Sequence, residues 1–228
     1  MVREAMVVLS VAGAAWGQFT AFQGNAATEA AWRVAAGGGV PREDFESFHG
    51  VPSPFSGPSD PVPHLASLRL NLYGAEAGTY PGVYSDGSFA HSGVNQIANF
   101  GAGGGQFSDY FVEPEPGLSI RALGFWQCDP QGDVTFEAYG AGNVLVGTIH
   151  GLINNGSGNS FAAFISDVPI VRVRVLGNEG DGWNHTDDWQ VVVAPLGCYA
   201  NCDGSTTAPV LNVLDFACFL NRFAAGCS

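Results

Sequence analysis

The last thirty or so residues carry side-chain oxygen atoms at a spacing that suits a bound cation. Asn201, Asp203 and Ser205 occupy every second position, and Asn212 and Asp215 follow after a short insertion. Alternate residues of a calcium loop point toward the ion, and such loops use carboxylate, amide and hydroxyl oxygens as ligands. Apolar residues at positions 216, 219, 220 and 223 then recur at helical spacing. The pattern predicts a calcium loop leading into a helix, as in half of an EF-hand; a merely solvated polar loop is the alternative.

Four of the five cysteines lie in the same segment, at Cys198, Cys202, Cys218 and Cys227. Four cysteines allow three pairings. We expect Cys198–Cys227 and Cys202–Cys218, because a segment too small to build its own core benefits from such covalent links. A zinc site is the alternative, but it usually takes two closely spaced pairs, and the intervals here are three and eight residues. The remaining Cys128 is expected to be a buried thiol.

From Cys198 to Cys227 the sequence resembles the C-terminal dockerin-like, EF-hand-like segments of many secreted planctomycete proteins. The resemblance implies that the five oxygen-bearing residues named above are calcium ligands. It also implies a role in attachment, which would include docking to a surface protein. Recognition by a cohesin-like partner is an analogy to that family. The sequence departs from the family at two points, since residues 206–209 lengthen the loop and only two of the ligands are acidic. Dockerins proper also contain two such repeats, whereas this chain has one.

The larger, preceding part resembles bacterial extracellular jelly rolls of the galactose-binding-like and carbohydrate-binding-module type. The segments that carry this resemblance are residues 43–48, 95–100, 124–126 and 187–189. The resemblance implies a structural calcium ion held by one acid of the first strand and one of the last. Glu46 and Asp188 match those positions, and Asp44 and Asp187 are the alternative ligands. Solvated carboxylates at strand ends are the other interpretation.

A glycine-rich acidic loop around Trp183 is a candidate sugar-binding site. The indole face of Trp183 suits the C–H-rich side of a sugar ring, and Asp181 and Asn184 could hydrogen-bond its hydroxyls. Tyr73, Tyr80 and Tyr84, in another glycine-rich stretch, are the second candidates. The alternative is that Trp183 covers the core at the rim of the sandwich.

Catalysis receives no positive support from the sequence. No GxSxG, HExxH, P-loop or GxGxxG motif occurs in a suitable context, and the five histidines are scattered without metal-ligand spacing. We therefore expect that the protein is not an enzyme. Glycoside hydrolysis needs only two carboxylates, for which Glu46, Asp133 and Glu137 could be nominated, but their separation in space cannot be read from sequence.

Short alternating segments separated by Gly, Pro and Asn turns predict an all-β fold, an antiparallel jelly-roll β-sandwich over residues 18–193. The predicted strands lie at residues 68–72, 120–126, 133–139, 144–149, 161–165, 170–176 and 189–193. A short N-terminal helix is expected over Ala30–Ala36, capped by Thr28. Residues 194–197 read as a linker, and residues 198–228 as the small disulfide-stapled loop-helix segment.

Composition and the first residues indicate an exported protein. Hydrophobic residues make up 46% and charged residues 13% of the chain, which excludes disorder and coiled coils. The net charge of −13, with no lysine, disfavours nucleic acid and anionic lipid and favours divalent cations. Residues 1–17 combine an apolar run with small residues before Gln18, the pattern of a signal peptide; a buried N-terminal helix is the alternative. No later segment is long and apolar enough for a membrane span.

These observations predict a secreted or cell-surface, non-catalytic binding module with structural calcium. Its ligand would be an extracellular polysaccharide or matrix glycan, and its C-terminal segment would attach it. A structural matrix protein without a small ligand is the second hypothesis, and an extracellular glycan hydrolase is the third. Exposed aromatic side chains over one sheet face would favour the first hypothesis, and a featureless polar surface the second. A cleft with two suitably spaced carboxylates would favour the third.

Overall fold

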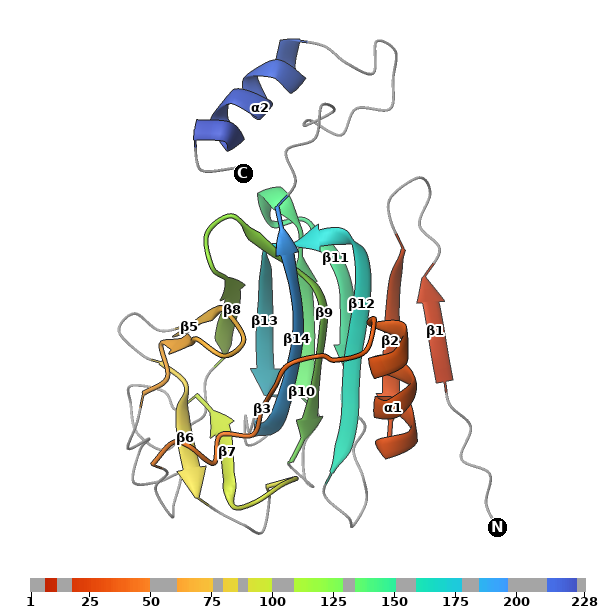
Figure 1. Ribbon diagram of the computed structural model, residues 1–228, viewed down its shortest axis with the longest axis vertical. Helices are drawn as coiled ribbons and strands as arrows, with labels where there is room; N and C mark the ends of the chain where they lie inside the picture. Colours follow the sequence, from red (N-terminus) through yellow and green to blue (C-terminus); the bar gives the residue numbers. More distant parts are fainter. Residues whose placement is uncertain are drawn as a thin grey trace.

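The computed structural model describes the chain in ten stretches, and its core is a sandwich of two antiparallel β-sheets (Figure 1). The described stretches are residues 7–11, 18–49, 61–75, 80–85, 90–99, 109–128, 134–150, 159–177, 185–196 and 213–224, with only the backbone described at 7–11 and 222–224. The predicted all-β sandwich is confirmed. Within the described stretches the α-helices are α1 (Ala26–Ala35) and α2 (Val213–Ala224), and a 3-10 turn spans Ala141–Asn143.

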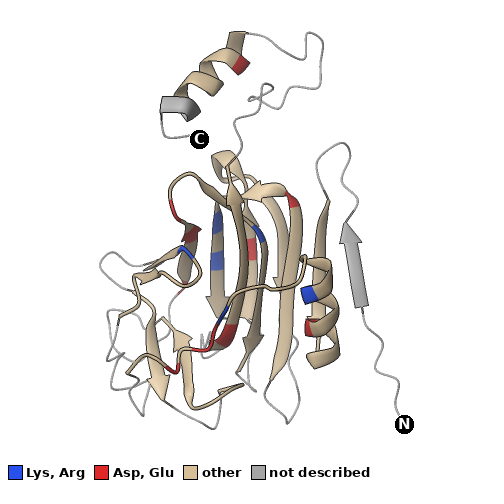
Figure 2. Cartoon of the chain, in the orientation of Figure 1, with Lys and Arg blue, Asp and Glu red and all other residues tan. Residues whose placement is uncertain are grey.

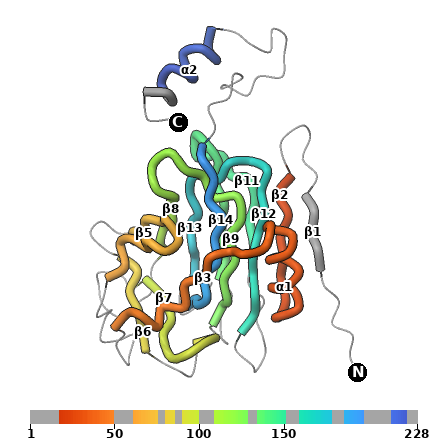
Figure 3. Tube along the Cα trace, viewed as in Figure 1, coloured from red at the N-terminus to blue at the C-terminus, as the bar shows by residue number. Residues whose placement is uncertain are grey.

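The two sheets, here called sheet A and sheet B, draw strands from all along the chain. Sheet A contains, in spatial order, β1 (Val7–Val11), β2 (Phe19–Gly24), β12 (Ser160–Ile170), β9 (Leu118–Gln127), β14 (Thr186–Pro195), β7 (Asn95–Ala98) and β6 (Gly82–Ser85), with β3 (Arg42–Glu43) paired to β14. Sheet B contains, in spatial order, β11 (Leu145–His150), β10 (Val134–Tyr139), β13 (Arg172–Gly177), β8 (Tyr110–Pro114), β5 (Leu70–Gly74) and β4 (His64–Leu65). Figure 3 shows that neighbouring strands such as β2 and β12 are distant in sequence.

The core between the sheets follows the predicted alternation. On β10, Val134, Phe136 and Ala138 are buried, and on β13 Val173 and Val175 are buried while the arginines between and before them face outward. Trp189 of β14 lies fully buried at the centre, with its ring edge-on to those of Phe45 and Phe136. The period of two therefore placed the buried apolar residues and the two arginines correctly, whereas Thr135, expected on the outward face of β10, is only 8% exposed.

Helix α1 covers the outer face of sheet A. Trp32 is fully buried against Phe161 and donates its indole N–H to the carbonyl of Phe164 at 3.1 Å. The helix begins earlier than expected, because Asn25, with extended dihedral angles, accepts the amide of Ala27 and caps it. The predicted cap Thr28 is wrong; it lies inside the first turn and is buried.

The N-terminal edge of sheet A is formed by β1, which pairs with β2 in antiparallel register from Val7–Gln23 to Val11–Phe19. These five residues belong to the apolar run of the predicted signal peptide, residues 1–17. Export of the protein stays a prediction. None of the helices within the described stretches is long and apolar enough to cross a membrane.

The C-terminal segment is described only from residue 213 to residue 224. Strand β14 continues to Pro195, two residues beyond the predicted end of the sandwich at 193. Helix α2 begins at Val213, close to the predicted amphipathic helix, and Asp215 lies in its first turn. Cys218 is disulfide-bonded, while Cys198, Cys202 and Cys227 lie outside the described residues, so the proposed pairing stays a prediction. Cys128 is a buried thiol, as expected.

Candidate functional site

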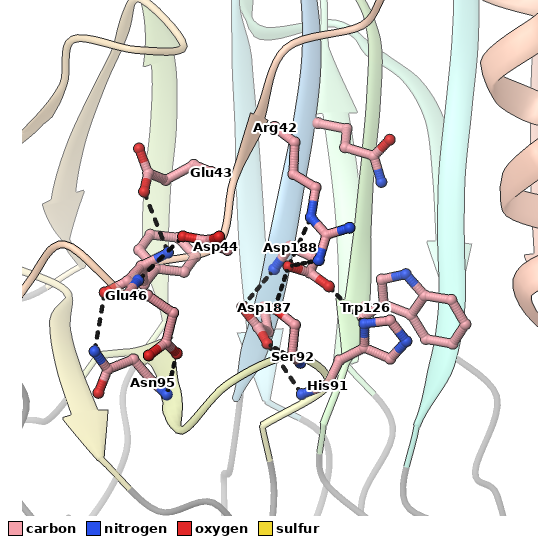
Figure 4. Close-up of polar contacts among 12 residues, drawn as sticks. Arg42, Glu43, Asp44, Glu46, His91, Ser92, Asn95, Trp126, Asp187 and Asp188 are labelled. Atoms are coloured by element: carbon pink, nitrogen blue, oxygen red, sulfur yellow. Dashed lines mark hydrogen bonds and ion pairs between the residues drawn. The ribbon is translucent and has the colours of Figure 1, made fainter.

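A bulge in β14 brings two adjacent carboxylates to one place. The register between β14 and β9 shifts between Asp187 and Gln190, and Asp188 adopts a φ of 51°, which is uncommon for a residue other than glycine. Both aspartates are fully buried, and both reach the segment around His91 and Ser92 (Figure 4). Asp187 and Asp188, together with their partners Arg42, His91 and Ser92, are called the bulge cluster below.

Asp188 is the ion-paired member of the bulge cluster. Its carboxylate accepts Arg42 Nε at 2.8 Å, Ser92 Oγ at 2.8 Å and His91 Nδ1 at 2.5 Å. Burial alone would raise the pKa of Asp188, but hydrogen bonds from His91, Ser92 and Arg42 together hold it below its ordinary value. The His91 ring also stacks on Trp126, with ring centroids 3.7 Å apart. The segment before β7 is thereby fixed to sheet A.

Asp187 accepts three backbone amides. Its carboxylate oxygens lie 3.0 Å from His91 N, 2.9 Å from Ser92 N and 2.6 Å from Asp188 N. Burial raises the pKa of Asp187 to about 7, and the negative charge of Asp188 adds to the effect, although the amide hydrogen bonds oppose it. The two neighbouring acids therefore differ in protonation behaviour because only Asp188 has a cationic partner.

Glu46 closes a turn. Its Oε1 accepts the amides of Val94 at 2.8 Å and Asn95 at 2.7 Å. Gly93 has a φ of +58°, and a Cβ at that position would lie 2.3 Å from the Glu46 carboxyl group, so a larger residue at position 93 would displace this contact. Asp44 is exposed and accepts the Glu46 amide at 3.2 Å.

The predicted calcium ligands Asp44, Glu46, Asp187 and Asp188 are each bonded to groups of the protein, and calcium binding by them stays a prediction. Figure 4 shows Glu46 beside Asn95, Asp44 next to Glu46, and Asp187 and Asp188 beside His91 and Ser92. A calcium ion needs oxygen ligands, whereas these carboxylates face amide, imidazole and guanidinium N–H groups. In the stretches that the structure describes, no group of three His, Cys, Asp or Glu residues could hold a metal ion.

The tail calcium loop is outside what the structure describes. Asn201, Asp203, Ser205 and Asn212 lie in residues that are not described, and Asp215 is buried in the first turn of α2. Calcium binding by these five residues stays a prediction.

The predicted sugar-binding residues differ in whether the structure describes them and in how exposed they are. Trp183, Asp181 and Asn184 lie outside the described residues. Tyr80 is 42% exposed, as a surface contact requires. Tyr84 is fully buried with its ring parallel to that of His185, so it presents no face to solvent. Burial also raises the pKa of the Tyr84 hydroxyl.

The outer side of sheet B carries a surface of which the sequence singled out only Tyr73 and Glu137. It is called the sheet B face and consists of Tyr73, Asp109, Phe111, Glu113, Glu137, Tyr139, Arg172 and Arg174. Each of these side chains is partly exposed. The strand register explains why they meet, since Tyr73, Phe111, Arg174 and Glu137 are successive cross-strand neighbours on β5, β8, β13 and β10.

One half of the sheet B face is a row of planar groups. The rings of Tyr73 and Phe111 stack with centroids 5.3 Å apart, and the Arg172 guanidinium lies 5.4 Å from the Phe111 ring centroid. Tyr73 donates its hydroxyl to Glu113 at 2.5 Å, and Arg172 Nε donates to the same carboxylate oxygen at 2.7 Å. Burial and the Glu113 carboxylate raise the pKa of Tyr73 to about 12, so its hydroxyl remains a donor at neutral pH.

The other half of the sheet B face is a second ion-pair network. Arg174 Nε donates to Asp109 at 3.1 Å, and the terminal nitrogen Nη1 of the same arginine lies 3.6 Å from Glu137. Tyr139 donates its hydroxyl to Glu137 at 2.7 Å. Figure 2 shows basic residues on β13 with acidic residues on neighbouring strands. The face therefore combines apolar rings with oppositely charged groups that are already held in position.

The comparisons with known proteins assign neither a family nor a function. No family model and no curated protein sequence matches the chain. A tailspike protein 4 enzymatically active domain from bacteriophage CBA120 is 14% identical over 54% of this chain, with a TM-score of 0.30, and this chain spans only 19% of that domain. TmCBM61, solved in complex with beta-1,4-galactotriose, is 13% identical over 67% of this chain and 99% of its own length, with a TM-score of 0.29. At such TM-scores neither likeness carries an argument about this protein.

Proposed function

We propose that the protein is a non-catalytic, carbohydrate-binding jelly-roll module whose ligand binds on the sheet B face. The observation that carries the proposal is the combination on one surface of a Tyr73–Phe111 ring pair with two preformed arginine–carboxylate networks. Sugars present both C–H-rich patches and hydroxyl groups, so they match a surface that offers apolar rings beside hydrogen-bond donors and acceptors.

Preorganisation supports this assignment. Arg172 and Arg174 are each held by two or more partners, so a ligand does not have to order these long side chains on binding. Loss of side-chain freedom is a main cost of association, about 0.5–1.5 kcal/mol for each side chain immobilised. A face built in this way differs from the featureless polar surface expected of a purely structural building block.

A hydrolase is a weaker alternative. Of the nominated carboxylates, Glu46 accepts two backbone amides, Glu137 accepts the Tyr139 hydroxyl, and Asp133 lies outside the described residues. Asp187 and Asp188 adjoin each other, are fully buried, and accept amide, imidazole and guanidinium hydrogens. A glycosidase places one carboxyl group on each side of the scissile bond, with access to substrate. The bulge cluster is instead suited to holding the segment before β7 against sheet A.

Three further parts of the proposal concern the ends of the chain. Residues 1–17 would direct export, the loop before α2 would bind calcium, and residues 198–228 would attach the module to an extracellular or cell-surface partner. The motifs described in the sequence support these parts. Calcium dependence of the attachment segment is their most direct test, because a cation that binds only the folded form raises its stability.

The proposed site predicts the effect of removing one ring. Phe111→Ala takes away the central planar group of the sheet B face, and we expect glycan affinity to fall about tenfold or more. Screening the full chain on a glycan array would first identify a ligand, and calorimetry would then compare the two proteins. Val34→Ala is the matched control, because Val34 is an exposed apolar residue on α1, over the opposite sheet. Equal affinity in the Phe111→Ala variant would place the site elsewhere.

A further inference from the structure

The charge arrangement of the sheet B face restricts the kind of glycan that it can accept. The face holds two cationic side chains, Arg172 and Arg174, and three acidic ones, Asp109, Glu113 and Glu137. The whole chain carries a formal net charge of −13. An approaching anion therefore meets a negative protein and a face on which acids outnumber bases.

Each of the three guanidinium nitrogens of Arg172 already has a partner in the protein. Its Nε and one terminal nitrogen each lie 2.7 Å from Glu113 Oε1, and the other terminal nitrogen donates to Asn143 Oδ1 at 3.2 Å. A carboxylate or sulfate group of a ligand would have to displace Glu113 to obtain a paired contact. The displaced acid would then remain beside the incoming anion, and like charges at such separations repel.

Arg174 is engaged in the same way by two acids. Its Nε and one terminal nitrogen bind Asp109 Oδ2, and its remaining nitrogen faces Glu137 at 3.6 Å. On each arginine the two-donor fork formed by Nε and one terminal nitrogen is therefore already occupied by an acid. A ligand carboxylate or sulfate would compete with that acid for the fork.

Neutral hydroxyl groups meet no such obstacle. A hydroxyl both donates and accepts, and an ionised carboxylate has about four lone-pair positions, so Glu113 and Glu137 can each accept from a sugar while still holding their arginines. Adjacent hydroxyls on one ring could bind a carboxylate and a guanidinium together. The ring edges of Tyr73 and Phe111, next to these groups, suit the C–H patches of the same sugar.

Resting on the carbohydrate-binding function proposed above, we propose that the sheet B face selects neutral glycans with free neighbouring hydroxyls and rejects glycans that carry uronate or sulfate groups. The selectivity resides in the paired state of Arg172 and Arg174. Glu113 and Glu137 are specificity-determining residues because Glu113 occupies the fork of Arg172 and Glu137 places a negative charge beside the remaining nitrogen of Arg174.

The test compares neutral and charged polymers that share a backbone. The full chain would be run in affinity gels containing galactan or sulfated galactan, and fully methyl-esterified or de-esterified polygalacturonate, together with neutral glucan and mannan. We expect retardation by at least one neutral polymer, with little change between about 50 mM and 200 mM salt, and none by the charged polymers. Salt screens exposed charges, so a charge-driven interaction would weaken over this range.

A charge-matched pair of variants locates the selectivity. Glu137→Gln removes one acid beside Arg174, and we expect retardation by the anionic polymers to appear or to increase about fivefold. Asp44→Asn changes the net charge of the chain equally, but Asp44 is an exposed residue following β3 of sheet A. We expect that variant to behave as the unmodified protein does, and an equal gain in both would overturn the role of the sheet B face.

The outcomes separate the two proposals. Salt-sensitive binding of anionic polymers by the unmodified protein, at least as strong as binding of the neutral ones, would overturn the selectivity and leave carbohydrate binding intact. Absence of binding to every glycan on both the array and the gels would overturn the proposed function itself. Neutral selectivity that Phe111→Ala abolishes and Glu137→Gln relaxes would support both.

Discussion

Replacement of Asp188 by alanine is expected to lower the free energy of unfolding by about 3–5 kcal/mol. The substitution leaves Arg42, His91 and Ser92 without the buried carboxylate to which all three are bonded. The buried carboxylate accepts three hydrogen bonds, so its removal loses all three contacts at once, although Arg42 and His91 are partly exposed and can be solvated afterwards. The substitution also places alanine at a φ of 51°, a conformation that aspartate tolerates better because its side chain can hydrogen-bond locally. Urea unfolding of the two proteins measures the loss.

Two control variants separate the contributions. Asp188→Asn retains a side chain that tolerates the left-handed backbone, so it isolates the loss of charge, and we expect a smaller effect than for alanine. Asp44→Ala removes an exposed acid of the same region and is expected to change the free energy by no more than about 0.5 kcal/mol. If Asp188 acts only through these contacts, the alanine loss should be the same in calcium and in excess chelator. A loss confined to calcium-containing buffer would support the predicted role of Asp188 as a calcium ligand.

The pH dependence of stability should change when Asp187 is replaced by asparagine. Because folding raises the pKa of Asp187 to about 7, the folded protein holds this proton more tightly than the unfolded chain does. Its stabilising contribution is complete below about pH 4, and the free energy of unfolding decreases as the pH rises toward 7. The total decrease from this one group is up to about 4 kcal/mol. The asparagine variant lacks this pH-dependent decrease in the free energy of unfolding.

Urea unfolding at several values between pH 4 and pH 8 would reveal this contribution as a difference between the two proteins. Burial lowers the pKa of His185 to about 3, so its effect runs in the opposite direction, with stability lost as the pH falls below about 6.5. His185 is present in both proteins, and subtraction removes its effect to a first approximation. Parallel pH profiles would show that Asp187 stays ionised throughout, held by its three amide donors.

The fold was predictable where the period of the strands was regular. Alternation on β10 and β13 correctly identified the buried apolar residues and the outward Arg172 and Arg174, although Thr135 is also buried. The start of α1 was misjudged because Thr28 and Asn25 are both good capping residues, and the backbone conformation at Asn25 decides between them. The local sequence pattern therefore predicted which strands and helices form, but not where each one begins and ends.

The sites were less predictable, because they depend on which strands become neighbours. Phe111 and Glu113 on β8 face Arg174 and Arg172 only through the pairing of β8 with β13, across about sixty residues of sequence. Likewise, the partners of Asp188 follow from a bulge and a positive φ that no sequence period reveals. Tyr84 was expected at the surface because it lies in a glycine-rich stretch, but its position on β6 buries it.

The position of β1 at the border of sheet A has a consequence for any shortened form of the protein. In a chain lacking residues 7–11, the amide and carbonyl groups of Phe19–Gly24 that now pair with β1 would face solvent. That segment contains no proline and no charged residue, the features by which natural proteins keep such borders from pairing with other chains. Self-association through β2 is therefore the hazard to monitor, by light scattering at increasing concentration, in any preparation that begins at Gln18.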